Sequence, residues 1–152
     1  MLKGEELAQK RIALDGLEAF CTMAMVRAGL SPADAEISAR VLSTNDSWGI
    51  HTHGTRQIRG LMKNVANGRI DPKAAPSVIG EGPAWALVDG NRAMPMVTSC
   101  RAMQVAMEKA KASGIGFAGV RHSSHFAAAG YYAVMAAQAD MIGLSMTNVD
   151  PW

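Results

Sequence analysis

The stretch that decides the fold is "IGFAGVRHSSHFAAAGYYAVMAAQADMIGLSMTNV", residues 115–149. It opens with a short, continuous apolar run over residues 115–121, which is typical of a buried parallel strand. An apolar helix is predicted next, over residues 126–140, followed by a second buried strand over residues 141–149. Strand, helix and strand in this order predict a βαβ unit, whose connection prefers a right-handed crossover. This stretch therefore places the chain in the α/β class.

The residues before this stretch are predicted to form helices first and short strands later. Ser31, Pro32 and Asp34 give a helix start signal, with a capping hydroxyl, a proline in the first turn and a capping-box acid. The apolar spacing predicts four helices, within residues 11–30, 31–49, 55–66 and 94–113. Short β-prone pieces are predicted at residues 77–79 and 85–88.

A change in composition and in the spacing of apolar residues near residues 70–76 predicts a boundary between two parts of the chain. Prolines and glycines break the sequence there, after an N-terminal part dominated by helical spacing. We predict a helical subdomain over residues 1–72 and an α/β part over residues 73–152. The chain stops at Asp150-Pro151-Trp152, directly after a predicted core strand. Because a βαβ unit needs further elements to cover its apolar faces, part of the fold is expected to be missing.

Composition argues for a soluble protein without a nucleic-acid or membrane partner. The chain is 49% hydrophobic and 18% charged, and its net charge of +2 comes from dispersed basic residues rather than a basic stripe. Cys21 and Cys100 are isolated, as expected of buried, reduced thiols in the cytoplasm. The charged N-terminus lacks the apolar stretch of a signal peptide. The longest apolar run is shorter than the ~20 residues that span a bilayer.

The segment "GIHTHGT", residues 49–55, places two of the four histidines two residues apart. Three interpretations stay open: histidines bonded to the loop backbone, an H-x-H metal chelate, or acid–base catalysis near neutral pH. No nearby carboxylate or cysteine completes a metal cluster. The small neighbours Thr52 and Gly54 would let a substrate approach. Arg56 and Arg59 follow, either to bind a substrate carboxylate or as a solvated helix face.

The other two histidines lie in "RHSSHF", residues 121–126, after the predicted strand 115–121. Ligands of open α/β sheets bind outside the carboxyl ends of the strands, and helix N-termini favour anions. His125 is therefore placed for a substrate or a cofactor phosphate. Ser123 and Ser124 either donate hydroxyl groups there or cap the next helix. The segment "GIGFAG", residues 114–119, falls within a strand and is not interpreted as a dinucleotide fingerprint.

These motifs together resemble those of a known family. "GIHTHGT" followed by "NVANGRI" is similar to its S-H-G segment and downstream N-G-x-I, and residues 88–151 resemble its central stretch throughout. The family is the malate/L-lactate dehydrogenase type that is unrelated to the Rossmann lactate dehydrogenases. Its members include ureidoglycolate and sulfolactate dehydrogenases and diketogulonate reductase. The resemblance covers almost the whole chain.

The resemblance implies an oxidoreductase that uses NAD or NADP and acts on a 2-hydroxy or 2-oxo acid. It implies a homodimer in which the partner subunit helps to complete the site. The implied fold is a helical subdomain followed by a non-Rossmann, three-layer α/β/α cofactor domain with a mixed sheet. Residues 73–152 would be the first part of that cofactor domain. The non-catalytic alternative is a truncated remnant that keeps only the oligomerisation surface.

The resemblance also carries residue roles by position. His53 and His125 match the two histidines given acid–base roles in the family, whereas His51 is interpreted as a structural neighbour. The full set of expected site residues is as follows: catalytic His53 and His125; substrate-binding Thr52, Arg56 and Arg59; cofactor-binding His122, Ser123, Ser124, Thr147 and Asn148; and no metal ligand.

Four positions depart from the family pattern. Thr52 stands where serine is usual and keeps the hydroxyl group, whereas Gln57 replaces a usual arginine that is a candidate anchor for the substrate carboxylate. His122 replaces a usual asparagine, and Ala127 a usual glycine. The Gly-Thr-Asn-Pro segment of the family is absent. These departures concern the substrate most directly.

Overall fold

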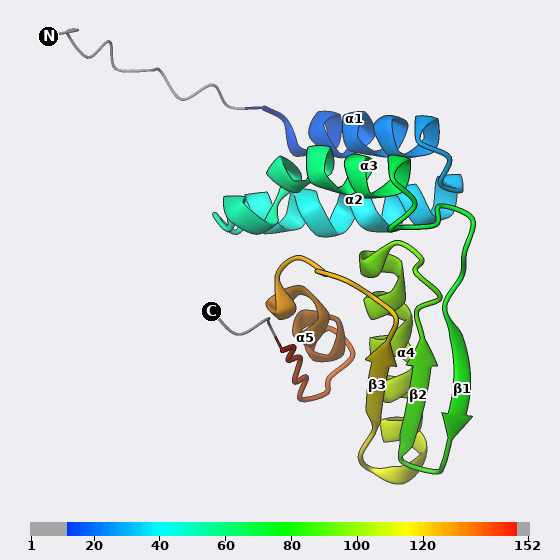
Figure 1. Cartoon of the computed structure of the whole chain (residues 1–152). Helices are drawn as coiled ribbons and strands as arrows, with labels where there is room; N and C mark the ends of the chain where they lie inside the picture. The colour runs from blue at the N-terminus through cyan, green and yellow to red at the C-terminus, as the bar shows by residue number, and fades with distance from the viewer. Residues whose placement is uncertain (1–11, 149–152) are drawn as a thin grey trace, which may run out of the picture.

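The computed structural model, which describes residues 12–148, places a group of helices above an α/β part (Figure 1). The helical group contains α1 (Leu14–Arg27), α2 (Pro32–Ser47) and α3 (Ile58–Ala66). Two 3₁₀ turns, η1 (His51–His53) and η2 (Thr55–Gln57), connect α2 to α3. The predicted helices are therefore confirmed here, with the first turn of the third helix tightened to 3₁₀ geometry.

The start of α2 forms as its sequence signal predicts. The Ser31 hydroxyl accepts a hydrogen bond from the backbone N–H of Asp34 at 3.1 Å and donates one to the Asp34 carboxylate at 2.7 Å. Pro32 occupies the first turn, where its missing N–H costs nothing. The cap fixes where α2 begins, and hence where its last turn delivers the histidine segment.

The α/β part is built on a mixed three-stranded sheet in the order β1-β2-β3. β1 (Ser77–Glu81) pairs antiparallel with β2 (Trp85–Asp89), which pairs parallel with β3 (Phe117–Arg121). The connection from β2 to β3 runs through α4 (Pro95–Ser113). The strands β2 and β3 point their carboxyl ends toward the helical group (Figure 1).

The helix α4 lies close against β3. Gly114 ends the helix in the left-handed conformation, with φ +80°. Gly116 then passes so near the Ala106 carbonyl of α4 that a Cβ atom at this position would overlap it. The two glycines of Gly-Ile-Gly, residues 114–116, therefore serve a turn and a close backbone approach rather than a phosphate loop.

The predicted second strand, residues 141–149, is wrong for its described part. Residues 142–148 form no strand pairing, and residue 149 lies outside the described residues. The alternation typical of a strand is present, since the side chains of Ile142, Leu144 and Met146 are 95%, 77% and 79% exposed. However, Gly143 packs against Ala133 of helix α5, so this segment follows the helix rather than a strand. The βαβ unit of the structure is instead β2–α4–β3.

The burial expected for the first strand is also wrong. β3 is an edge of the sheet, and Phe117 is 63% exposed. The helix that follows, α5 (Ala129–Ala137), is shorter than the predicted 126–140. Ala127 and Asp140 take positive φ values of 69° and 57°, which helix geometry does not permit.

A single cluster of buried side chains joins the helical group to the α/β part. Met25 and Leu42 of the helices belong to the same cluster as Met96 of α4 and Tyr132 of α5, and these residues are almost completely buried. Both cysteines are buried and free, as predicted. The boundary at residues 72 and 73 stays a prediction, although the core itself is continuous across it. Within residues 12–148, no helix is long and apolar enough to cross a bilayer.

Candidate active site

The first histidine motif is a tight turn held from behind by the last residues of α2. The buried Asn45 side chain donates a hydrogen bond to the His53 carbonyl at 2.9 Å. His51 contacts the Asp46 carboxylate through Nδ1 at 3.0 Å. The turn is a 3₁₀ segment rather than the extended loop that a simple H-x-H chelate would need. The two histidines consequently have different partners.

Asp46 explains the glycine and the threonine that follow the histidines. Its carboxylate accepts hydrogen bonds from the Thr55 backbone N–H at 2.8 Å and from the Thr55 hydroxyl at 2.6 Å. A Cβ atom on Gly54 would overlap this carboxylate, so a larger residue there would displace Asp46 from its bonds to Thr55. Burial alone would raise the pKa of Asp46, but the hydrogen bonds from Thr55 and His51 lower it. The sequence interpretation missed Asp46; an acidic residue at the end of a helix, five positions before a histidine, is a weak signal.

The structure brings His53 and His125 together from distant parts of the chain. Their ring centroids lie 5.2 Å apart, with the planes tilted by 46°. His53 Nδ1 contacts the Thr52 hydroxyl at 2.9 Å. His125 comes from the loop between β3 and α5, and His53 from the turn after α2. The two motifs therefore form one site between the helical group and the sheet.

Gln57 bridges the two motifs and fixes the proton on His125. Its side-chain nitrogen donates to the Thr52 carbonyl at 3.0 Å and contacts His125 Nε2 at 2.8 Å. An amide nitrogen has only donors to offer, so His125 Nε2 must accept, and the proton of the neutral ring lies on Nδ1. Burial, followed by the charge of His53, lowers the pKa of His125. Gln57 was noted only as a departure from the family arginine, yet it touches the site directly.

Beside this pair, Asp89 ties together the carboxyl ends of β2 and β3. Its carboxylate accepts hydrogen bonds from Arg121 Nε at 2.9 Å and the Asn91 backbone N–H at 2.9 Å, and contacts His122 Nδ1 at 3.0 Å. The Asn91 N–H is the largest cause that lowers the pKa of Asp89 to about 2, and Arg121 and His122 lower it further. The predicted second motif is therefore anchored to the sheet by a carboxylate from the neighbouring strand.

The turns around this anchor contain unusual backbone geometry. Asn91, Arg92, His122 and Ala127 all take φ values between +49° and +69°. Residues other than glycine adopt this region rarely, at a cost of about 1–3 kcal/mol each, and such positions gather at functional sites. The asparagine usual at position 122 and the glycine usual at 127 are residues that tolerate it, and histidine tolerates it better than most.

Four of the predicted site residues make no hydrogen bond to the histidine pair within the described chain. Arg56 and Arg59 are exposed, and within residues 12–148 neither side chain makes a hydrogen bond or an ion pair. Thr147 and Asn148 are exposed near the end of the described chain, where the Thr147 hydroxyl bonds to the Asn148 carbonyl at 3.1 Å. Their roles in binding stay predictions. Over the described residues, no group of three metal-ligating side chains gathers.

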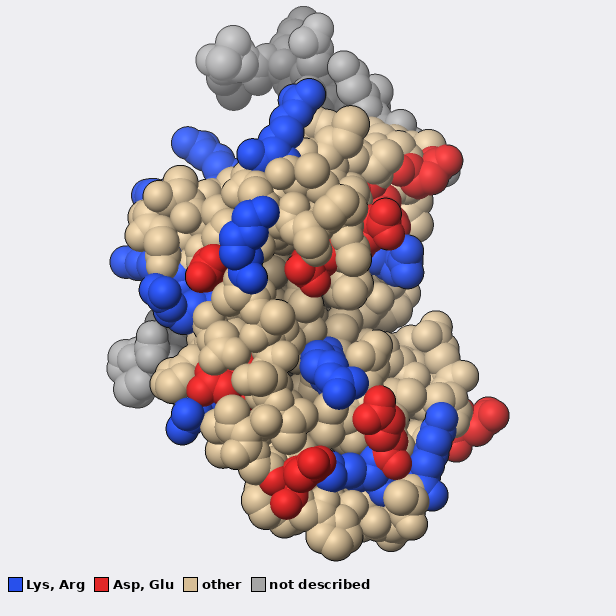
Figure 2. Space-filling view, turned by 90° about the vertical axis from the view of Figure 1, so that its right-hand side faces the viewer, with Lys and Arg blue, Asp and Glu red and all other residues tan. Residues whose placement is uncertain are grey.

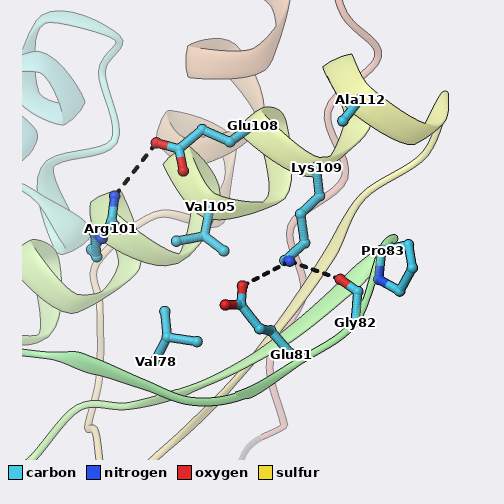
Figure 3. Close-up of a pocket in the computed structure, with 9 residues that line it drawn as sticks. All are labelled: Val78, Glu81, Gly82, Pro83, Arg101, Val105, Glu108, Lys109 and Ala112. Atoms are coloured by element: carbon cyan, nitrogen blue, oxygen red, sulfur yellow. Dashed lines mark hydrogen bonds and ion pairs between the residues drawn. The ribbon is translucent and has the colours of Figure 1, made fainter.

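A separate hollow lies between the β1–β2 hairpin and α4 (Figure 3). It measures about 480 Å³, but its charges neutralise one another. Lys109 pairs with Glu81 at 2.9 Å, and Arg101 pairs with Glu108 at 3.5 Å. Charges of both signs are also interspersed over the face shown in Figure 2. This hollow offers no unpaired charge for recognising an ionic ligand and contains none of the predicted site residues.

Comparison with known proteins decides the family. The family model described as "Malate/L-lactate dehydrogenase" matches residues 12–152. The chain belongs to the malate/L-lactate dehydrogenase family. The fold agrees: the chain superimposes on a malate dehydrogenase from Pyrococcus horikoshii with a TM-score of 0.83 and 35% identity, over 86% of this chain and 37% of that one.

Two curated members of the family show how the match is distributed. A malate dehydrogenase from Pyrococcus abyssi is 40% identical over 141 residues, which are 93% of this chain and 39% of the relative. An L-sulfolactate dehydrogenase from Methanocaldococcus jannaschii is 34% identical over 143 residues, which are 94% of this chain and 39% of the relative. The chain thus spans about two fifths of the length of these relatives. It is similar to their N-terminal portion, and the superposition confirms the expected α/β fold.

Proposed function

We propose that this chain forms part of an oxidoreductase that transfers a hydride between a nicotinamide cofactor, NAD or NADP, and a 2-hydroxy or 2-oxo acid. The substrate would be of the malate, lactate or ureidoglycolate type. The observation that carries the proposal is the pairing of His53 with His125 across two segments of the chain. Family membership supports the reaction class, since the relatives are named malate and sulfolactate dehydrogenases.

The proposed role of the histidine pair is proton transfer at the substrate hydroxyl. Oxidation of an alcohol requires that the hydroxyl proton be removed, and a neutral imidazole can accept it. His125 suits this role because its lowered pKa keeps the ring neutral, and its Nε2, which accepts a hydrogen bond from Gln57 in this structure, would accept the substrate proton in place of that bond. In the reverse direction the protonated ring returns the proton to the carbonyl oxygen. His53 holds the other side of the site, oriented by the Thr52 hydroxyl.

The residues present fit part of a nicotinamide dinucleotide. The loop with His122, Ser123 and Ser124 follows β3, at the edge of the sheet where α/β proteins hold the anionic parts of such ligands. When bound, the cofactor supplies or accepts the hydride. Substrate binding by Thr52, Arg56 and Arg59, and cofactor contacts by Thr147 and Asn148, belong to the same proposal. So do a homodimeric assembly and a cytoplasmic location.

The test is the rate of nicotinamide reduction by a full-length enzyme that carries this segment, measured by absorbance with malate, lactate and ureidoglycolate. His125→Ala should lower kcat about 10²–10⁴-fold, the usual contribution of a general base. Arg101→Gln, in the hollow remote from the histidines, serves as the control and should keep the parental rate. Unchanged turnover after His53→Ala and His125→Ala together would show that the catalytic assignment is wrong.

A binding experiment separates the proposal from the non-catalytic alternative. Titration of the 152-residue chain with NADH and NADPH should show binding if the first part of the cofactor site is functional on its own. The truncated-remnant alternative expects no binding of either nucleotide. Micromolar affinity for one of them would eliminate that alternative.

A further inference from the structure

A small basic pocket lies beside the second histidine loop. Arg69, Arg92, His122, Ser123 and Ser124 line it together with two apolar side chains, and none of its described lining residues carries a carboxylate. Its volume is about 140 Å³. This is the space of about five water molecules at ~30 Å³ each, well below the ~300–1,000 Å³ of pockets for drug-sized ligands. The pocket therefore fits one ionic group rather than a whole dinucleotide.

Both arginines have donors to spare. Within the described part of the chain, Arg69 forms no side-chain hydrogen bond and no ion pair. Arg92 uses Nη1 for the Gly68 carbonyl, at 3.1 Å, and keeps the rest of its five N–H donors. The Asp71 N–H bonds to the Arg92 carbonyl, but within the described residues the Asp71 carboxylate forms no ion pair with either arginine and accepts a hydrogen bond from the Lys73 N–H at 2.9 Å. The Asp89 carboxylate is already occupied by Arg121 and His122. The positive charge of the pocket is thus not neutralised by the protein.

The backbone holds the pocket's residues in place. The Arg92 N–H donates to the His122 carbonyl at 3.0 Å, and the Gly90 N–H donates to the Arg121 carbonyl at 2.8 Å. Arg92 itself has φ +60°, a conformation in which glycine or asparagine would be far less strained. An arginine kept at such a position, beside an unpaired second arginine, points to a function of its side chain.

We propose that this pocket binds a phosphoryl group, with Arg69 and Arg92 as its main donors and Ser123 and Ser124 as hydroxyl donors. Guanidinium groups match phosphate oxygens in a bidentate way, and two of them balance a dianion. A carboxylate has two oxygens and one charge, against the three terminal oxygens and up to two charges of a phosphate monoester, so it would leave more donors unpaired. The inference rests on the proposed function only for the source of the group, which would be a phosphate of the nicotinamide cofactor.

The experiment is a titration of the ¹⁵N-labelled 152-residue chain with inorganic phosphate, followed by the amide signals of Ser123 and Ser124. We expect a saturable shift whose affinity decreases as sodium chloride is added, because the pocket is exposed and its charges are screened. Arg69→Gln removes no side-chain hydrogen bond or ion pair within the described chain, and Arg92→Gly relieves a left-handed residue, so both variants should stay folded. Each should weaken phosphate binding about 10-fold or more, since charge-assisted hydrogen bonds are lost.

Arg101→Gln is the matched control, because it removes an arginine from the other hollow, and it should bind phosphate like the parent. Circular dichroism of each variant verifies that the fold is intact. Phosphate affinity unchanged by both Arg69→Gln and Arg92→Gly would overturn the inference. Malonate that displaces phosphate at equal concentration would also overturn it, because the pocket would then be a general anion site.

Competition with nucleotides identifies the source of the phosphoryl group. Equal displacement of phosphate by NADH and NADPH supports the diphosphate, whereas displacement about 10-fold better by NADPH supports its 2′-phosphate. If neither nucleotide competes while binding still depends on both arginines, the pocket is supported and free phosphate is its ligand. Failure of the hydride-transfer assay affects only the proposed function, since phosphate binding is read without turnover.

Discussion

At the scale of single residues, the site depends on how three polar side chains hold the histidines. Gln57 bonds to His125, Asp46 bonds to His51, and Asp89 bonds to His122. Two of the three partners are carboxylates with lowered pKa values. The exception is His125, whose partner is a neutral amide and whose own pKa is lowered. This difference in partners supports the proposed role of His125 as the proton acceptor.

Replacing Gln57 by glutamate should raise the pKa of His125. A carboxylate at this position accepts a hydrogen bond from a protonated Nε2 and stabilises the charged ring, whereas the wild-type amide donates to an unprotonated Nε2 and favours the neutral ring. Histidine Cε1–H signals followed by NMR over pH 4–9 measure the change directly. Arg56→Gln lowers the net charge by the same single unit at an exposed neighbouring position and should leave His125 almost unaffected. A His125 titration identical in Gln57→Glu and wild type would contradict the contact.

Asp89 should make stability depend on acid pH. Its pKa is depressed to about 2 in the folded state, against 3.8 ordinarily, so its stabilising contribution is present above about pH 4. That contribution is lost as the pH falls through the folded value. The urea midpoint of the wild type should therefore decrease more between pH 6 and pH 3 than that of Asp89→Asn. Asp15→Asn, at an exposed residue with only a local bond to Gly16, is the control and should behave like the wild type. Parallel pH curves for the wild type, Asp89→Asn and Asp15→Asn would show that Asp89 does not cause the acid dependence.

At the scale of elements, the decisive contact is that between α4 and β3. This contact makes the crossover β2–α4–β3, which sets the carboxyl ends of two parallel strands side by side. Asp89 and Arg121 are register partners at those ends. The position of the second histidine loop therefore depends on how closely α4 approaches the strand that precedes the loop.

Gly116→Ala should destabilise the protein by about 1–3 kcal/mol, since its Cβ would overlap the Ala106 carbonyl and the backbone would have to move. Gly60→Ala is the matched control, because a Cβ there meets nothing within 4 Å and lies in helix α3. That change should stabilise the protein by about 0.5–1 kcal/mol through helix propensity. Chemical denaturation gives both values. Equal effects of the two substitutions would show that the approach of α4 to β3 is not tight.

At the scale of the whole molecule, the site lies where the two parts of the fold meet. The helical group contributes His53 and Gln57, and the α/β part contributes His125. One core cluster runs beneath them, with Leu42 on the helical side and Tyr132 on the other. Any movement of one part against the other would therefore change the distance between the paired histidines.

We expect the chain to unfold in one cooperative transition, because its core is shared. Fluorescence of Trp48, at the end of α2, and of Trp85, in β2, should give the same denaturation midpoint. Each is measured in a variant that lacks the other two tryptophans. Leu42→Ala, in the helical group, should lower both midpoints together, at a cost of about 2–5 kcal/mol. Separate midpoints would instead support independent domains on either side of residues 72 and 73.

Local patterns in the sequence were enough to place most elements and to pair the site motifs with the right family. The start of α2 at Ser31, Pro32 and Asp34 and the end of α4 at Gly114 depend on hydrogen bonds and φ values within a few residues. Such short-range preferences act on the chain wherever it is, so the sequence alone determines them. The family motifs likewise identified His53 and His125 before their contact was known.

Only the tertiary structure decided which residues surround those histidines. Gln57 meets His125 across 68 positions, and Asp89 meets His122 across 33, so no local pattern encodes either contact. Residues 142–148 have the alternation of a strand but follow α5, because a strand forms only where another strand offers its backbone groups. The sequence by itself therefore determined most of the elements and the candidate reactive residues. The packing of α2 against α4 and α5 determined how the candidate reactive residues meet, because hydrogen bonding and pKa depend on neighbours that are distant in the chain.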